Sequence, residues 1–168
     1  MTLKPLRKTA YNFQELYLWH DNRGGAGTFP PGLTVQPGEH YESPETKRRL
    51  NNLLEVSGIL DHVVRIKATA ASMDQLELCH YREYVEKIQN LSKKQGGEAG
   101  IGVPFGVGSF DIAALAVGGV IAIAEAVWKQ EVQNGYALVR PPGHHAVAHQ
   151  GMGFCIFANL AITAKWLM

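Results

Sequence analysis

The segment Tyr136–Ala146 reads YALVRPPGHHA, and this pattern decides the fold. Its first four residues form an apolar run of strand length. The Arg-Pro-Pro-Gly that follows ends the run, because proline lacks the amide that a strand needs and glycine favours a turn. In open, mainly parallel α/β sheets, ligands bind outside the carboxyl ends of the strands. We therefore expect the reactive residues of the chain in the loop after this strand.

Two adjacent histidines, His144 and His145, are the candidate reactive groups of this loop. Imidazoles can move protons near neutral pH or bind a metal. Joint metal binding is the weaker interpretation, because neighbouring side chains project in different directions and no Cys, Asp or Glu stands nearby at ligand spacing. His149 could add a third nitrogen. The dipeptide alone also fits two hydrogen-bonded loop histidines without a catalytic role.

Helical and strand patterns surround this loop. Ser43-Pro44-Glu45 is typical of a helix start, and the spacing of Ser72 and Gln75 fits a capping box. Clustered glycines favour an α/β enzyme with long loops over a helical bundle. The expected elements are helices over residues 43–58, 72–88, 109–127 and 156–168, strands over 11–19, 63–66 and 136–139, and a glycine-rich loop over 92–108.

Composition excludes several classes of protein. The 168 residues suit one globular domain, and 16 Lys and Arg against 15 Asp and Glu give a net charge of +1, which disfavours binding to nucleic acid. The longest uncharged apolar stretch, Ile112–Ala124, is shorter than the ~20 residues that cross a bilayer, so no membrane span is expected. Two cysteines and a charged Met1–Lys8 segment without an apolar h-region indicate a reducing, cytoplasmic setting.

Longer stretches resemble a known family. The segments Ala137–Ala146 and Gly151–Phe157 closely resemble the signature of the histone deacetylase superfamily, most strongly the bacterial class II-like amidohydrolases and their acetylpolyamine-hydrolysing relatives. The resemblance implies the three-layer arginase/deacetylase fold, an α/β architecture with a mainly parallel sheet. Residues 1–168 are then expected to be the N-terminal half of a single catalytic domain. Further matching blocks are Tyr17–Asp21, Val35–His40, Ser43–Leu50 and Gly118-Gly119.

The resemblance also implies a chemistry for individual residues. It implies zinc-dependent hydrolysis of an acetyl-amide, in acetyl-lysine or an acetylpolyamine, by a metal-activated water. His144 matches the general base, and His145 matches its neighbour, which helps to deliver the proton to the leaving amine. Gly153 and Phe154 match the wall of the tunnel that takes the acyl-amine stem, and Pro142 matches its base.

The resemblance implies as well that some positions are missing. The family's zinc ligands are an Asp-x-His pair on the next strand and a later Asp, and its potassium site uses later residues too; none of these positions precedes Met168. No metal ligands are therefore assigned within the chain, and residues 1–168 alone are expected to be inactive. The alternative is a non-catalytic, truncated domain. A parallel sheet cut after one of its strands leaves an unpaired edge, which favours a homo-oligomer or a binding partner.

Overall fold

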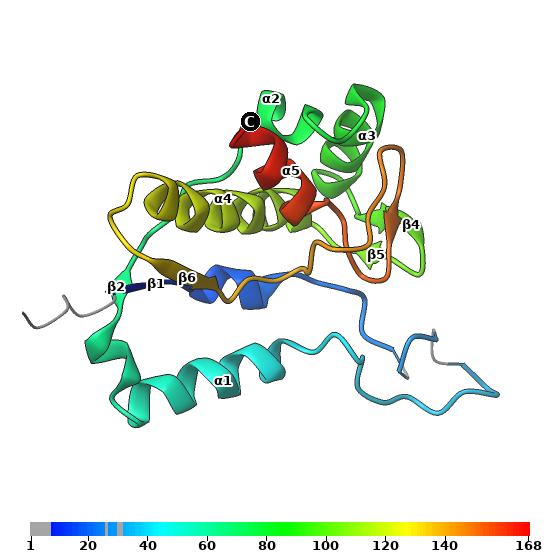
Figure 1. Cartoon of the computed structure of the whole chain (residues 1–168). Helices are drawn as coiled ribbons and strands as arrows, with labels where there is room; N and C mark the ends of the chain where they lie inside the picture. The colour runs from blue at the N-terminus through cyan, green and yellow to red at the C-terminus, as the bar shows by residue number, and fades with distance from the viewer. Residues whose placement is uncertain (1–7, 26, 30–31) are drawn as a thin grey trace, which may run out of the picture.

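The central sheet contains β1 (Thr9–Asn12), β2 (Val64–Arg65) and β6 (Asn134–Ala137). All three strands are parallel and lie in the order β2-β1-β6 (Figure 1). The computed structural model describes residues 8–25, 27–29 and 32–168, so the predicted charged segment up to Arg7 lies outside the described residues. A hydrogen bond from the Leu138 amide to the Asn12 carbonyl extends the pairing past β6, and the strand itself begins two residues earlier than predicted.

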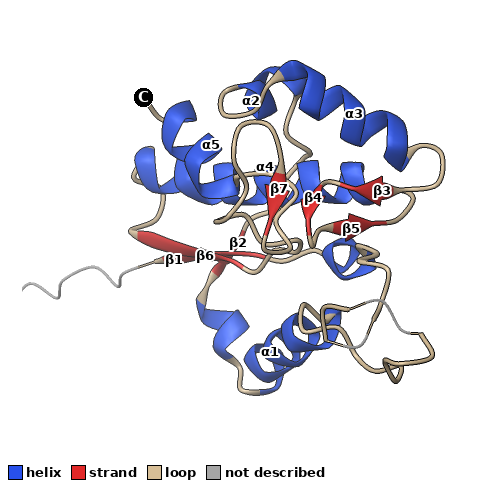
Figure 2. Ribbon diagram, turned by 90° about the vertical axis from the view of Figure 1, so that its right-hand side faces the viewer, coloured by secondary structure: helices blue, strands red, loops and turns tan. Residues whose placement is uncertain are grey.

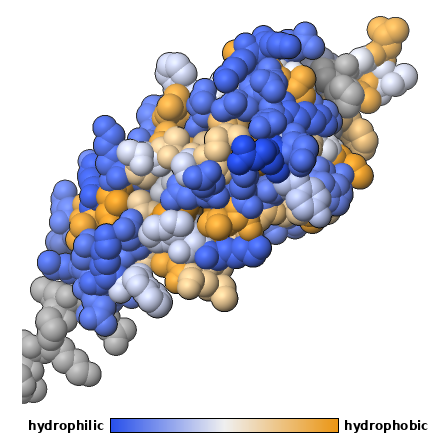
Figure 3. Space-filling view, turned by 90° about the horizontal axis from the view of Figure 1, so that it is seen from above, coloured by the Kyte–Doolittle hydropathy of each residue, from blue (hydrophilic) through white to orange (hydrophobic). Residues whose placement is uncertain are grey.

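Helices cover both faces of this sheet, which makes three layers (Figure 1). One face carries α4 (Ser109–Trp128), and α2 (Met73–Glu77), α3 (Arg82–Ser92) and α5 (Asn159–Trp166) pack on the outer side of α4. The other face carries α1 (Pro44–Val56). The core of the larger helical layer buries apolar residues from these helices, including Leu76, Val85, Ile88, Val117 and Ile162. Seen from above, this layer presents mostly polar residues with scattered apolar ones (Figure 3). Two 3-10 turns, η1 (Glu15–Trp19) and η2 (Ile59–His62), lie before and after α1 in the sequence.

The apolar helix α4 is longer than the uncharged stretch Ile112–Ala124, because Asp111 and Glu125 lie within it. By length and composition alone it could cross a membrane. However, 67% of the window that passes this test is buried inside the fold. Helix α4 therefore forms the central packing element of the helical layer, as a buried core helix does.

The predicted loop over residues 92–108 contains three short strands, which corrects the prediction. Strands β3 (Gly97–Glu98) and β5 (Pro104–Phe105) pair antiparallel with each other. Strand β4 (Gly100–Ile101) pairs in parallel with β7 (Gly151–Met152), which belongs to the segment after the two histidines (Figure 2). The pairing of segments so distant in the sequence cannot be inferred from local patterns.

Several helix predictions are confirmed and others are wrong. Ser43 caps α1 by accepting a hydrogen bond from the Glu45 amide at 3.2 Å, and the capping box at Ser72 is present in α2. The single helix expected over 72–88 is broken into α2 and α3, because Tyr81 is extended and its amide bonds to the Ala148 carbonyl. The strand expected over 11–19 ends early and continues as η1, and α5 starts at Asn159 rather than residue 156.

The close approach of α4 to residues 69–71 leads to a prediction about Gly118. A Cβ atom at this position would lie 1.8 Å from the Thr69 carbonyl oxygen, so backbone must move to admit it. We expect Gly118→Ala to lower the free energy of unfolding by about 1–3 kcal/mol in urea denaturation, despite the better helix propensity of alanine. Gly32→Ala is the control, since its Cβ would meet nothing within 4 Å. Equal effects of the two changes would contradict the prediction.

Candidate active site

A buried arginine fixes the start of the loop that carries the two histidines. The Arg140 side chain is 1% exposed, and its Nε donates to Oε2 of Glu42 at 2.7 Å. Its Nη1 donates to the carbonyls of Leu18 and His20, and its Nη2 donates to the Glu42 carbonyl. Arg140 therefore joins two N-terminal segments to the end of β6. Burial lowers the pKa of Arg140, and the Glu42 carboxylate opposes this effect.

Sequence reasoning missed this role of Arg140, which it treated as part of a strand stop. The signal that could have found it is a single charged residue between an apolar run and two prolines. A charge in that position is buried and must have a partner. Its partner Glu42 is also buried, and its second carboxylate oxygen accepts from Nζ of Lys47 at 3.2 Å.

The two candidate histidines lie side by side on the surface of the loop. The ring centroids of His144 and His145 are 4.1 Å apart with an interplanar angle of 56°, and both residues are exposed. The His144 amide donates to Sγ of Cys155 at 3.3 Å, which ties the loop to the buried segment beneath it. Cys155 is buried, and burial raises the pKa of its thiol, which disfavours the thiolate form.

The structure brings Gly153 to His145 and places Phe154 against His40. A tight turn, held by reciprocal hydrogen bonds between Met152 and Cys155, places both residues in the left-handed region, with φ of 51° and 68°. A Cβ atom on Gly153 would lie 2.5 Å from Cδ2 of His145, so only glycine leaves room for the ring. The Phe154 ring is half-buried and makes an edge contact with the His40 ring, with centroids 5.0 Å apart.

His40 is a second site residue whose role the sequence analysis did not foresee. Its Nδ1 accepts hydrogen bonds from the Glu42 amide at 3.0 Å and from the Asn22 side chain at 3.1 Å. Burial lowers the pKa of His40, with the Glu42 carboxylate acting in the opposite direction. A neutral ring held by Nδ1 in this way packs at a fixed angle against Phe154.

Pro142 and His144 face a different hollow from that turn. The hollow measures about 340 Å³ and lies between β6, α4 and the start of α5. Gly153 and Phe154 are not among its lining residues. The predicted residues thus form two groups on either side of the paired imidazoles. The other lining residues are Val120, Ile123, Gly135, Tyr136, Ala137, Val139, Gly143, Asn159 and Leu160.

A zinc site does not assemble from the part of the chain that the structure describes. Within residues 8–25, 27–29 and 32–168, no group of three or more His, Cys, Asp or Glu side chains is placed to hold a metal ion. His149 lies apart from the histidine pair, on an exposed turn, where its ring stacks on Tyr81 at 6.5 Å. The donor set of these residues therefore does not fit zinc, which needs three or four such ligands.

Comparison with known proteins decides the family. The family model for the histone deacetylase domain matches residues 40–168. The chain belongs to the histone deacetylase family. The resemblance stated from the sequence motifs is thereby confirmed.

Individual histone deacetylase relatives support the same assignment. The chain is 46% identical over 162 residues to a histone deacetylase-like amidohydrolase of Pseudomonas aeruginosa, covering 95% of this chain and 43% of that protein. It is 38% identical to a probable deacetylase of Archaeoglobus fulgidus, covering 77% of this chain and 38% of that protein. The chain thus spans less than half the length of these relatives.

A solved histone deacetylase structure confirms the predicted fold. The crystal structure of the HDA15 HD domain matches with a TM-score of 0.81 at 29% identity, covering 94% of this chain and 42% of that one. The α/β prediction of the arginase/deacetylase type, with a mainly parallel sheet between helical layers, is therefore correct.

Proposed function

We propose that this chain contributes the proton-transferring histidines and the tunnel wall of an amidohydrolase that removes acetyl groups from amines. The observation that carries the proposal is the contact of His145 with both His144 and Gly153 at the carboxyl end of β6. Parallel α/β sheets bind their ligands at this end. The names of the relatives, a histone deacetylase-like amidohydrolase and a probable deacetylase, support the same reaction class.

In the proposed reaction, water adds to the acetyl carbonyl and the C–N bond breaks, which gives acetate and a free amine. His144 accepts the proton of the attacking water, and the departing amine nitrogen takes up a proton as it leaves. The ring centroid of His145 lies 4.1 Å from that of His144, and His145 holds this proton and delivers it to the amine nitrogen. Because the described residues do not form a zinc-ligand set, we assign no step of the reaction to a metal.

The proposed substrate is acetyl-lysine or an acetylpolyamine. Both present an acetyl-amide on an unbranched methylene stem. The half-buried Phe154 ring offers such a stem an apolar wall, and the neighbouring Gly153 leaves room for the His145 ring. One curated relative, from mouse, carries the name polyamine deacetylase and is 36% identical over 139 residues.

The test is turnover of a fluorogenic acetyl-lysine peptide and of an acetylated polyamine by the purified, zinc-repleted protein. We expect His144→Ala to lower kcat at least ~100-fold, because general acid–base catalysis contributes about that much or more. His149→Ala is the matched control, since it removes an exposed imidazole outside the pair. Turnover by this chain would correct the expectation that residues 1–168 alone are inactive. Absence of turnover in the unaltered protein, or equal activity of the two variants, would overturn the proposal in favour of the non-catalytic domain.

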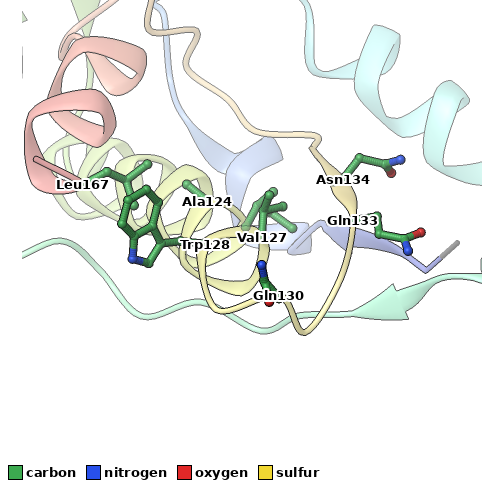
Figure 4. Close-up of a pocket in the computed structure, with 9 residues that line it drawn as sticks. Ala124, Val127, Trp128, Gln130, Gln133, Asn134 and Leu167 are labelled. Carbon is green, nitrogen blue, oxygen red and sulfur yellow. The ribbon is translucent and has the colours of Figure 1, made fainter.

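A second candidate, a non-catalytic domain that associates with a second copy or a partner, rests on the surface next to β6. In the described part of the chain β6 is an edge strand. Beside it Tyr136 is 53% exposed, Leu160 62% and Trp128 71%. Trp128, Val127, Ala124 and Leu167 also border a hollow of about 700 Å³ (Figure 4). Light scattering after gel filtration tests the self-association form of this candidate, because a clean monomer at micromolar concentration would exclude it, and metal-dependent turnover by the purified protein would overturn the candidate as a whole.

A further inference from the structure

The corner between α2 and α3 holds the segment that carries Gly153 and Phe154. Three hydrogen bonds join them. The Tyr81 amide donates to the Ala148 carbonyl at 2.9 Å, and the Tyr84 hydroxyl donates to the Ile156 carbonyl at 2.7 Å. The Ala158 amide donates to Nε2 of His80 at 2.9 Å. Residues 80–84 thus form one hydrogen bond with the segment before the Gly153-Phe154 turn and two with the segment after it.

Two of these bonds come from buried side chains. His80 is 3% exposed and Tyr84 is 5% exposed. Their rings pack on each other at 5.3 Å, and both contact the Phe157 ring, at 5.4 Å and 6.3 Å. Because Nε2 of His80 accepts from a backbone amide, its proton resides on Nδ1. Removal of either side-chain partner leaves a buried backbone group unpaired, which favours opening of the segment.

The turn itself needs such support. Phe154 has φ of 68°, in the left-handed region, which disfavours any residue with a Cβ atom. A residue in this conformation persists only where the surrounding structure holds it. Inside the turn the backbone hydrogen bonds are the reciprocal pair between Met152 and Cys155. The bonds from His80 and Tyr84 fix the chain directly after that pair.

We propose that His80 and Tyr84 are positioning residues for the Gly153-Phe154 turn, which hold Gly153 against His145 and Phe154 against His40. The inference rests on the proposed function for the importance of this geometry to substrate. The positions of these residues are observed in the structure and do not depend on the proposed function. The side chains reach the site through the backbone of residues 156–158 and touch neither imidazole of the pair.

Amide hydrogen exchange in the full chain tests the proposal. We expect Tyr84→Phe to accelerate exchange at the Met152 and Cys155 amides at least 10-fold, while amides in the middle of α4 change no more than the global loss of stability dictates. Tyr11→Phe is the matched control, because Tyr11 is also a buried residue and its hydroxyl bonds to Asn51 on the opposite side of the sheet. Uniform acceleration throughout the protein, or the same local effect in the control, would overturn the proposal.

Substitutions of His80 provide an independent test of the proposed positioning role. His80→Leu removes the acceptor for the Ala158 amide, and we expect the same local acceleration as for Tyr84→Phe. His80→Gln keeps a side-chain acceptor, and we expect it to restore slow exchange at least in part. A failure of His80→Gln to differ from His80→Leu would mean that the imidazole acts by packing alone, which contradicts positioning through the hydrogen bond.

An activity measurement separates this inference from the proposed function. If the protein hydrolyses acetyl-lysine peptides, we expect Tyr84→Phe to raise KM more than it lowers kcat, because the tunnel wall binds the stem and His144 is untouched. If the protein shows no turnover, the proposed function fails while the exchange experiment still decides the positioning role. A purely structural role would lower the apparent kcat through the fraction of folded protein and would leave KM unchanged.

Discussion

Arg140→Ala is expected to lower the free energy of unfolding by about 3–5 kcal/mol, because it leaves the buried carboxylate of Glu42 without its arginine partner. The Glu42 side chain is 4% exposed, so water cannot replace the lost ion pair. The carbonyls of Leu18 and His20 also lose their donors. Lys47 continues to pair with the second carboxylate oxygen, but it is partly exposed and contacts one atom only. Urea denaturation monitored by fluorescence measures the loss.

Two variants make this prediction specific to the buried pair. Arg48→Ala removes an exposed arginine that also has carboxylate partners, Glu15 and Glu45, and we expect it to change stability by less than ~1 kcal/mol. The double change Arg140→Met with Glu42→Leu removes both charges and is expected to be more stable than Arg140→Ala alone. A loss at Arg140 no larger than that at Arg48 would contradict the assignment of Arg140 as an anchor.

Local sequence patterns predicted the elements whose cause is local. The start of α1 depends on Ser43 and the residues directly after it, and the capping box of α2 depends on Ser72 and Gln75. Helix α4 follows from its apolar composition. At the starts of α1 and α2 the stabilising contacts join residues a few positions apart, so that the sequence contains them directly.

The features that sequence patterns missed are fixed by distant contacts. The break between α2 and α3 depends on Ala148, and the strand β4 depends on its pairing with β7. The burial of Arg140 depends on Glu42, far earlier in the chain. A periodic apolar pattern cannot show which of two distant segments will supply a hydrogen bond. These interactions therefore required the folded structure.

In the candidate site, too, the sequence pattern identified residues but not their distant contacts. The motif identified His144, His145, Gly153 and Phe154, and the family assignment supports the motif. The motif does not show that Gly153 contacts His145, nor that Pro142 and His144 face a separate hollow. It also gave no role to His40, whose ring contacts Phe154, or to His80, which accepts from the Ala158 amide.

Acidification provides the second large effect, and we expect the free energy of unfolding to fall as pH decreases from 6.5 towards 3. Burial, reinforced by the Arg140 guanidinium and by His40, lowers the pKa of His20 from its ordinary value of 6.5 to about 3. Between these values the unfolded chain binds a proton on His20 and the folded chain does not. The stabilisation is complete above pH 6.5 and is lost progressively below it, at up to about 1.4 kcal/mol per pH unit.

The size of this effect and its source can be separated. Over the whole window His20 accounts for about 5 kcal/mol, and His40 and His80 add to the slope because burial lowers the pKa of each. His20→Asn retains a polar partner for Ser109, whose Oγ lies 3.1 Å from Nδ1, and removes the titration. We expect this variant to show a shallower slope between pH 6 and 4 in urea denaturation, whereas His62→Gln, at an exposed position, should keep the slope of the parent protein.

A direct titration decides the case if His20→Asn fails to fold. The imidazole resonances of His20 in the folded protein should show no protonation shift between pH 7 and 4, because the ring is 4% exposed and lies beside the Arg140 guanidinium. Acid unfolding should then precede protonation of the native ring. A His20 resonance that titrates near pH 6.5 in the folded state would contradict the prediction. In that case the buried network around Arg140 would tolerate a second positive charge without loss of the fold.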